Sequence, residues 1–177
     1  MHPKKFALWL IIVSIVMIFA SMTSAYLVRR DDGNWAEFNL PPVLWASSIV
    51  LLLSSVTMHW AYIEAKHNNF GRLRIALALT TLLGALFVYL QFTGWQYLVD
   101  VGVYLVGNPS GSFLYVITGL HAFHLISGMV FLLIVLWQAY RSQVNSKSLV
   151  SIEMCTTYWH FLDGLWIYLF IFLLINH

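Results

Sequence analysis

Hydrophobic residues occur along this chain in five long runs separated by shorter polar stretches. The runs cover about 6–28, 41–63, 75–98, 112–140 and 154–175. A bilayer core about 30 Å thick is crossed by about 20 apolar residues in a helix that rises about 1.5 Å per residue. Every run reaches that length. The pattern therefore predicts an all-α protein, a polytopic membrane bundle of five transmembrane helices that forms a single membrane domain over residues 1–177.

The positive charges lie mostly on one side of these predicted spans. Seven of the nine lysines and arginines belong to the N-terminus and to the second and fourth loops: Lys4, Lys5, Lys66, Arg72, Arg74, Arg141 and Lys147. Arg29 and Arg30 belong to the opposite side. Cytoplasmic loops carry the excess of positive charge, so we expect the N-terminus in the cytoplasm and the C-terminus outside. The basic residues of the two inner loops, Lys66, Arg72, Arg74, Arg141 and Lys147, are expected to contact anionic lipid head groups.

Composition agrees with a membrane environment. Hydrophobic residues make up 60% of the chain and charged residues only 9%, against about 25% charged residues in soluble domains. The net charge of +2 is small and dispersed, which argues against a nucleic-acid partner. The single cysteine, Cys155, excludes an intrachain disulfide and a metal cluster built from cysteines.

Six ionisable residues fall inside or at the ends of the later spans: His59, His121, His124, Glu153, His160 and Asp163. His121 and His124 are three residues apart and therefore share one helix face, as do His160 and Asp163. An unpaired ionisable group is costly in hydrocarbon, so we expect these side chains to face the bundle and to find partners there. Counted along the helices, His124 and Asp163 lie near the membrane midplane and would meet if their helices are neighbours.

Three chemistries compete for these residues. Histidines on facing helices can ligate haem, which would pair His121 or His124 with His59 or His160. A di-iron site is disfavoured because it needs about four carboxylates, whereas Asp163 is the one carboxylate deep in a predicted span. A proton path is disfavoured because it needs acceptors at every depth, and the first and third spans offer few. We interpret the polar residues as hydrogen-bonding groups that fix helix packing; a stand-alone haem-binding membrane electron carrier remains the alternative.

Two motifs in the last two spans resemble a known family. The first is Gly119-Leu-His121-Ala-Phe-His124-Leu-Ile followed by Ser127-Gly128, and the second is Glu153-Met-Cys-Thr-Thr-Tyr-Trp-His160-Phe-Leu-Asp163. Both resemble signature segments of subunit III of the haem–copper oxidases. The loop that holds Gly102-Val-Tyr104 and Gly111-Ser-Phe113 is also similar to the loop of that family.

The resemblance implies a supporting role in a respiratory complex. Subunit III of this family carries no haem and no copper, packs on the catalytic subunit I, binds phospholipid, and sustains proton uptake and turnover stability. We therefore expect no catalytic, cofactor-binding or metal-binding residue in this chain, with haem and copper in partner subunits. The expected partners are subunit I by direct contact, subunit II and other respiratory-complex subunits, and membrane lipids, in a bacterial inner membrane. His121, His124, Glu153, His160 and Asp163 are then structural polar residues.

The chain departs from the common family pattern in two ways. The common form has seven helices where five are predicted here, so the lipid-holding cleft is either completed by another chain or absent. Many members also carry a buried glutamate in the helix equivalent to the first one, where Ile15 stands in this sequence. The segment 23–29 resembles bacterial cytochrome c oxidases more than quinol oxidases. A quinol oxidase subunit, or the related accessory protein of a nitric oxide reductase, is the alternative within the superfamily.

Overall fold

The computed structural model describes residues 3–33, 42–67, 70–102, 106–141 and 146–176. Five helices make up this part of the chain: α1 (Pro3–Asp31), α2 (Val43–Lys66), α3 (Phe70–Asp100), α4 (Pro109–Tyr140) and α5 (Ser146–Asn176). All five are long and apolar enough to cross a membrane, and the described residues contain no strand. The predicted all-α fold with five membrane-spanning helices is therefore confirmed.

Most helices extend beyond the apolar runs that predicted them. α3 begins at Phe70, where the sequence predicted a start near 75, and α5 begins at Ser146, where it predicted a start near 154. Hydropathy identifies only the stretch that lies in hydrocarbon, whereas intrahelical hydrogen bonds also continue through polar residues at the membrane surface. α2 instead begins slightly later, after Pro42, whose carbonyl accepts a hydrogen bond from the Trp45 amide at 3.1 Å.

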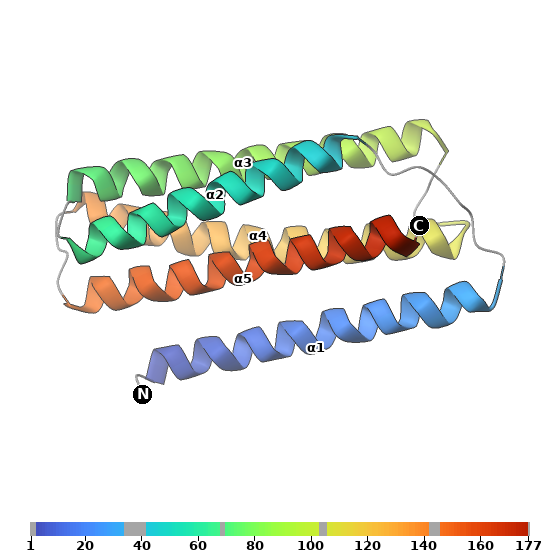
Figure 1. The fold of residues 1–177 in the computed structure, drawn as a ribbon, viewed down its shortest axis with the longest axis horizontal. Coiled ribbons are helices and arrows are strands. Elements are labelled where there is room, and N and C mark those ends of the chain that lie inside the picture. Colours follow the sequence, from blue (N-terminus) through green and yellow to red (C-terminus); the bar gives the residue numbers. More distant parts are fainter. Residues whose placement is uncertain (1–2, 34–41, 68–69, 103–105, 142–145, 177) are drawn as a thin grey trace.

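Helices α2 to α5 form a ring of four, and α1 lies outside it. Around the ring, α2 packs against α3, α3 against α4, α4 against α5, and α5 against α2. Among the described residues α1 contacts only α4 and α5, and Figure 1 shows it running along the lower edge of the bundle. We call the end of the bundle where α1 and α5 begin the basic end, because the residues at that end include Lys4, Lys5, Lys66, Arg72 and Arg74.

The centre of the ring is filled by two tryptophans of α5. Trp159 and Trp166 are fully buried. The indole nitrogen of Trp159 donates to the Ser54 hydroxyl at 3.0 Å, and that of Trp166 donates to the Ser48 hydroxyl at 2.9 Å, so both bond to α2. On α3, a Cβ atom added to Gly84 would lie 2.8 Å from Cη2 of Trp159. The missing side chain of Gly84 therefore creates the space that the Trp159 ring occupies.

α1 is attached to the ring by a single stripe of side chains. Its buried residues recur every three or four positions, as expected for one helix face: Leu8, Ile12, Ile15, Phe19, Thr23 and Tyr26. Near the C-terminal end of α1, the Tyr26 ring contacts Phe113 of α4 and Phe172 of α5, with ring centroids 5.8 and 5.0 Å apart. The Thr23 hydroxyl also lies 3.2 Å from the Tyr168 hydroxyl of α5. The other faces of α1 are exposed and apolar, as a lipid-facing helix requires.

Candidate functional site: polar groups between the helices

His121 of α4 lies at the centre of the bundle and is fully buried. Its Nε2 donates to the backbone carbonyl of Leu162 on α5, 3.1 Å away. Its ring packs 5.0 Å from the Trp166 ring and 5.8 Å from the Phe87 ring of α3. The side chain of His121 on α4 thus contacts both α3 and α5.

His124 points to a different neighbour, although it follows His121 by only three residues. Its Nδ1 donates to the Leu120 carbonyl of its own helix at 2.7 Å, and its ring lies edge-on to Phe19 of α1, 5.8 Å away. Close by, the hydroxyls of Ser127 and Tyr158 lie 2.9 Å apart and connect α4 to α5. His124 therefore belongs to the contact between α1 and the ring.

Asp163 of α5 faces α2 and not His124. The residue is only 4% exposed. Its carboxyl group lies near the hydroxyl of Ser55, but neither carboxyl oxygen makes a hydrogen bond to a described residue. His124 lies against α1, whereas Asp163 lies against α2. Although α4 and α5 are neighbours, these two side chains have separate partners.

His160 and His59 form a pair of rings between α5 and α2. His160 is half-buried, and its Nδ1 lies 2.5 Å from the Ser55 hydroxyl. The His59 ring lies 6.1 Å from the His160 ring, measured between centroids. His59 itself is exposed on the outside of α2. The prediction that every intramembrane histidine faces the bundle is therefore wrong for His59.

Glu153 joins the start of α5 to the start of α1. Its carboxylate lies 3.0 Å from Nζ of Lys5, and the two side chains are 40% and 32% exposed. A half-exposed ion pair of this kind contributes about 0.2–1 kcal/mol. It connects the basic end of α1 to the ring, next to the stripe of buried residues described above.

Exchanging these two charges tests that connection. We expect Lys5→Glu to place two carboxylates together and loosen α1, lowering the thermal stability of the solubilised chain by about 1 kcal/mol or less. The double variant Lys5→Glu with Glu153→Lys restores the attraction and should return the stability to within experimental error. The measurement is the thermal aggregation midpoint at low and high salt; a double variant as unstable as the single one would contradict a direct pairing.

The sequence did not predict the burial of Glu64. This residue lies just beyond the predicted end of the second span, yet it is only 7% exposed and its Oε1 accepts a hydrogen bond from the Trp60 indole at 3.0 Å. The sequence does contain a signal for this contact: Trp60 stands four residues before Glu64, on the same helix face, and its indole N–H needs an acceptor.

Aromatic rings accompany the basic residues of the two predicted inner loops. Nζ of Lys66 lies 4.5 Å from the Tyr62 ring centroid, and the guanidinium carbons of Arg74 and Arg141 lie 5.4 and 4.1 Å from the rings of Tyr140 and Trp137. Arg72 is exposed, and the side chain of Lys147 lies outside the described residues. Paired cations and aromatic rings of this kind are typical of a membrane–water interface.

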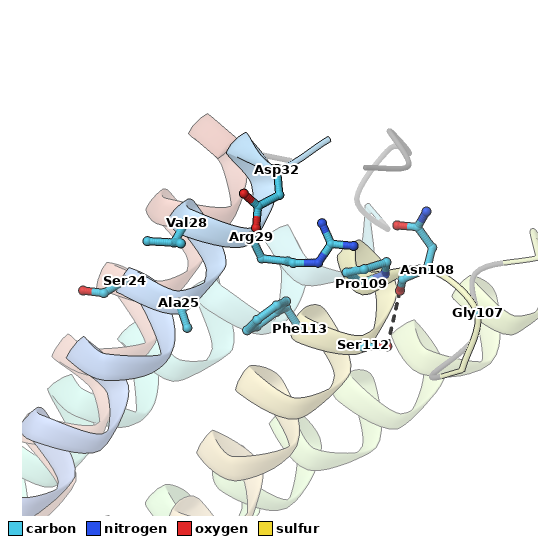
Figure 2. Close-up of a pocket in the computed structure, with 10 residues that line it drawn as sticks. All are labelled: Ser24, Ala25, Val28, Arg29, Asp32, Gly107, Asn108, Pro109, Ser112 and Phe113. Atoms are coloured by element: carbon cyan, nitrogen blue, oxygen red, sulfur yellow. Dashed lines mark hydrogen bonds between the residues drawn. The ribbon is translucent and has the colours of Figure 1, made fainter. Parts of the chain in front are cut away.

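Two open cavities lie where α1 meets the ring. The larger, about 660 Å³, is at the end opposite the basic end, between the end of α1 and the start of α4. Figure 2 shows Ser24, Ala25 and Val28 on one wall and Phe113 on the other, with Arg29 reaching from α1 toward Pro109. The second, about 500 Å³, lies near the basic end and is lined by α1, α4 and α5, including Lys4, Phe131 and Tyr158. Both are mainly apolar; the larger is lined by Arg29 and Asp32 as well, and the smaller by Lys4.

The fold and these contacts define a multi-pass membrane protein whose buried polar side chains mostly link helices to one another. In the described parts of the chain, no three histidine, cysteine, aspartate or glutamate residues are grouped so as to hold a metal ion.

Comparison with known proteins gives the family. The sequence model of the cytochrome c oxidase subunit III family matches residues 34–176, which include α2 to α5. The chain belongs to this family. It is 31% identical to cytochrome c oxidase subunit 3 of Corynebacterium diphtheriae, over 88% of this chain and 80% of that protein. It is 26% identical to the Bacillus subtilis protein of the same name (94% and 83%) and 28% identical to cytochrome bo(3) ubiquinol oxidase subunit 3 of Buchnera aphidicola (99% and 95%).

Proposed function

We propose that this chain is the non-catalytic subunit III of a bacterial terminal oxidase, a proton-translocating cytochrome c oxidase of the inner membrane. It packs on subunit I, in a complex that also holds subunit II, and sustains proton uptake and turnover stability there. Family membership is the observation that carries this proposal. The contacts of His121 support it, because its Nε2 and its ring are engaged with α5 and α3. Haem and copper belong, in this proposal, to the partner subunits.

The choice between cytochrome c and quinol as electron donor is part of this proposal. A relative named as a cytochrome c oxidase subunit and one named as a ubiquinol oxidase subunit both align with most of the chain, at 31% and 28% identity. The segment 23–29, which resembles cytochrome c oxidases, favours cytochrome c. It lies at the end of α1, outside the family match.

We further propose that phospholipids occupy the two cavities beside α1. Each cavity combines an apolar wall with charged residues at its rim: Lys4 in the cavity at the basic end, and both Arg29 and Asp32 in the other. The first suits an acyl chain beneath an anionic head group, and the second suits one beneath a zwitterionic head group. The basic residues at the α2–α3 and α4–α5 junctions, Lys66, Arg72, Arg74, Arg141 and Lys147, would contact head groups of the same leaflet as Lys4. That leaflet is the cytoplasmic one if the N-terminus is inside, as the charge distribution predicts.

Affinity purification of the tagged chain from native membranes in mild detergent tests the proposal. We expect a large haem-bearing subunit I and a subunit II to be recovered with it, and the identity of subunit II to distinguish a cytochrome c donor from a quinol donor. The chain purified away from its partners in stronger detergent should show no Soret absorption. Recovery of the chain alone would contradict the proposal, and a Soret band in the isolated chain would favour the haem-binding electron carrier.

A further inference from the structure

An exposed histidine of α2 and a half-buried histidine of α5 lie next to each other on the outside of the bundle, within the membrane-spanning parts of the two helices. His59 is exposed on α2, seven residues before Lys66 and therefore about 10 Å from the end of the helix. One turn earlier on the same helix, Val56 is 67% exposed. On α5, the half-buried His160 ring lies 6.1 Å from the His59 ring, and the exposed Gly164 lies one turn further along. We call Val56, His59, His160 and Gly164 the His59 face.

Hydrocarbon is an unfavourable environment for this face. The His160 ring bonds to Ser55 inside the chain, but the ring of His59 makes no hydrogen bond to any described residue. Acyl chains have neither donors nor acceptors, and polar groups at this depth normally face protein or water. We therefore expect the hydrogen-bond partner of the His59 ring to come from another molecule.

The shape of the face also suits a helix. A Cβ atom added to Gly164 would have nothing within 4 Å, so the α5 backbone is open to a neighbour at this point. Small residues at membrane helix surfaces allow a second helix to approach closely, and serine, threonine, asparagine, glutamine or histidine side chains then bond across the contact. The His59 face therefore combines two features within about two helical turns: an open backbone at Gly164 and the imidazole of His59, which needs a hydrogen-bond partner.

We infer that the His59 face docks a transmembrane helix of a partner subunit, one that carries a hydrogen-bonding side chain at the depth of His59. A lipid acyl chain has no group that pairs with the imidazole, so it explains the exposure of Val56 but not that of His59. The inference rests on the proposed function, because it requires an assembled complex. The inference goes beyond the proposed function by naming the face of the ring that contacts the partner subunit. That face is formed by α2 and α5, and not by α3.

Site-specific photo-crosslinking in the whole complex tests this inference. A benzophenone amino acid is placed at Val56, and its matched control is placed at Leu82 of α3, since these residues are 67% and 66% exposed. We expect irradiation of native membranes to give a protein adduct at Val56, identified by mass spectrometry as a transmembrane segment of subunit I or II, and lipid adducts at Leu82. A protein adduct at Leu82 with only lipid at Val56 would overturn the inference, as would an adduct of Val56 with a second copy of this chain.

Two substitutions at His59 give an independent readout. His59→Leu removes the hydrogen bond and is expected to reduce retention of this chain on the purified complex by about tenfold during detergent washing. His59→Gln keeps a donor and an acceptor and should restore most of that retention. Equal retention of the leucine variant and the unaltered chain would overturn the inference. Failure of the unaltered chain to purify with any oxidase subunit would instead contradict the proposed function, so the two failures are distinguishable.

Discussion

Replacing Gly84 with leucine is expected to abolish incorporation of this chain into its membrane complex. A Cβ atom at this position already meets Cη2 of Trp159 at 2.8 Å and Cζ2 at 3.2 Å, with Cγ of Met129 at 3.5 Å. The Trp159 ring has little room to withdraw, because it is fully buried and its N–H is bonded to Ser54 of α2. The leucine must therefore push α3 away from the Trp159 ring of α5, at a cost of about 1–3 kcal/mol or more.

The measurement is the amount of this chain that migrates with the oxidase on a native gel, relative to its amount in the membrane. Gly119→Ala is the control, since a Cβ atom there has no neighbour within 4 Å, and it should incorporate normally. Gly84→Ala should be intermediate. Adding Trp159→Phe to Gly84→Leu removes the ring atoms that clash and should recover part of the loss; normal incorporation of Gly84→Leu would show that α3 and α5 do not pack as described.

The five spans could be predicted from sequence because hydropathy depends only on local composition. Runs of about 20 apolar residues are needed to cross a bilayer, and those runs coincide with the five helices. The helix ends were less predictable, as α5 shows by beginning at Ser146. Backbone hydrogen bonding continues into polar residues that a hydropathy window treats as loop.

The arrangement of helices around the ring could not be predicted in the same way, and it decides which polar groups meet. Depth along the helix gave similar heights for His124 and Asp163, but contact also depends on the direction in which each side chain points. His124 follows His121 by one turn and its ring contacts Phe19 on α1, while Asp163 lies near Ser55 on α2. Small rotations of a helix about its axis determine such directions, and close packing at positions such as Gly84 fixes the rotation.

The same argument explains why His59 was predicted incorrectly. The rule that intramembrane polar groups face protein was applied to this chain alone, as if the chain were the whole protein. A subunit of a larger assembly can satisfy the rule with residues of a partner. The exposure of His59 is thus consistent with membership of a family that the comparisons name as an oxidase subunit.

Replacing His121 with alanine is expected to weaken the attachment of the chain to its complex and to leave the haem content of the remaining complex unchanged. The substitution removes the bond from Nε2 to the Leu162 carbonyl and leaves a cavity beside Trp166 and Phe87. A cavity in a packed core together with a lost hydrogen bond costs about 2–4 kcal/mol.

Comparison of three substitutions separates the contributions of volume and hydrogen bonding. His121→Leu fills most of the space and loses only the hydrogen bond, so its cost should be near the 1 kcal/mol typical of bonds between membrane helices. His124→Ala, at the edge of the ring beside α1, should cost less than His121→Ala because His124 is only half-buried. Thermal stability of the solubilised complex and haem per subunit I are the measurements. A packing residue affects how firmly the subunit is bound to the complex, but not the haem content of the partner subunit. Loss of haem in the His121 variants would therefore mean that this histidine binds the cofactor.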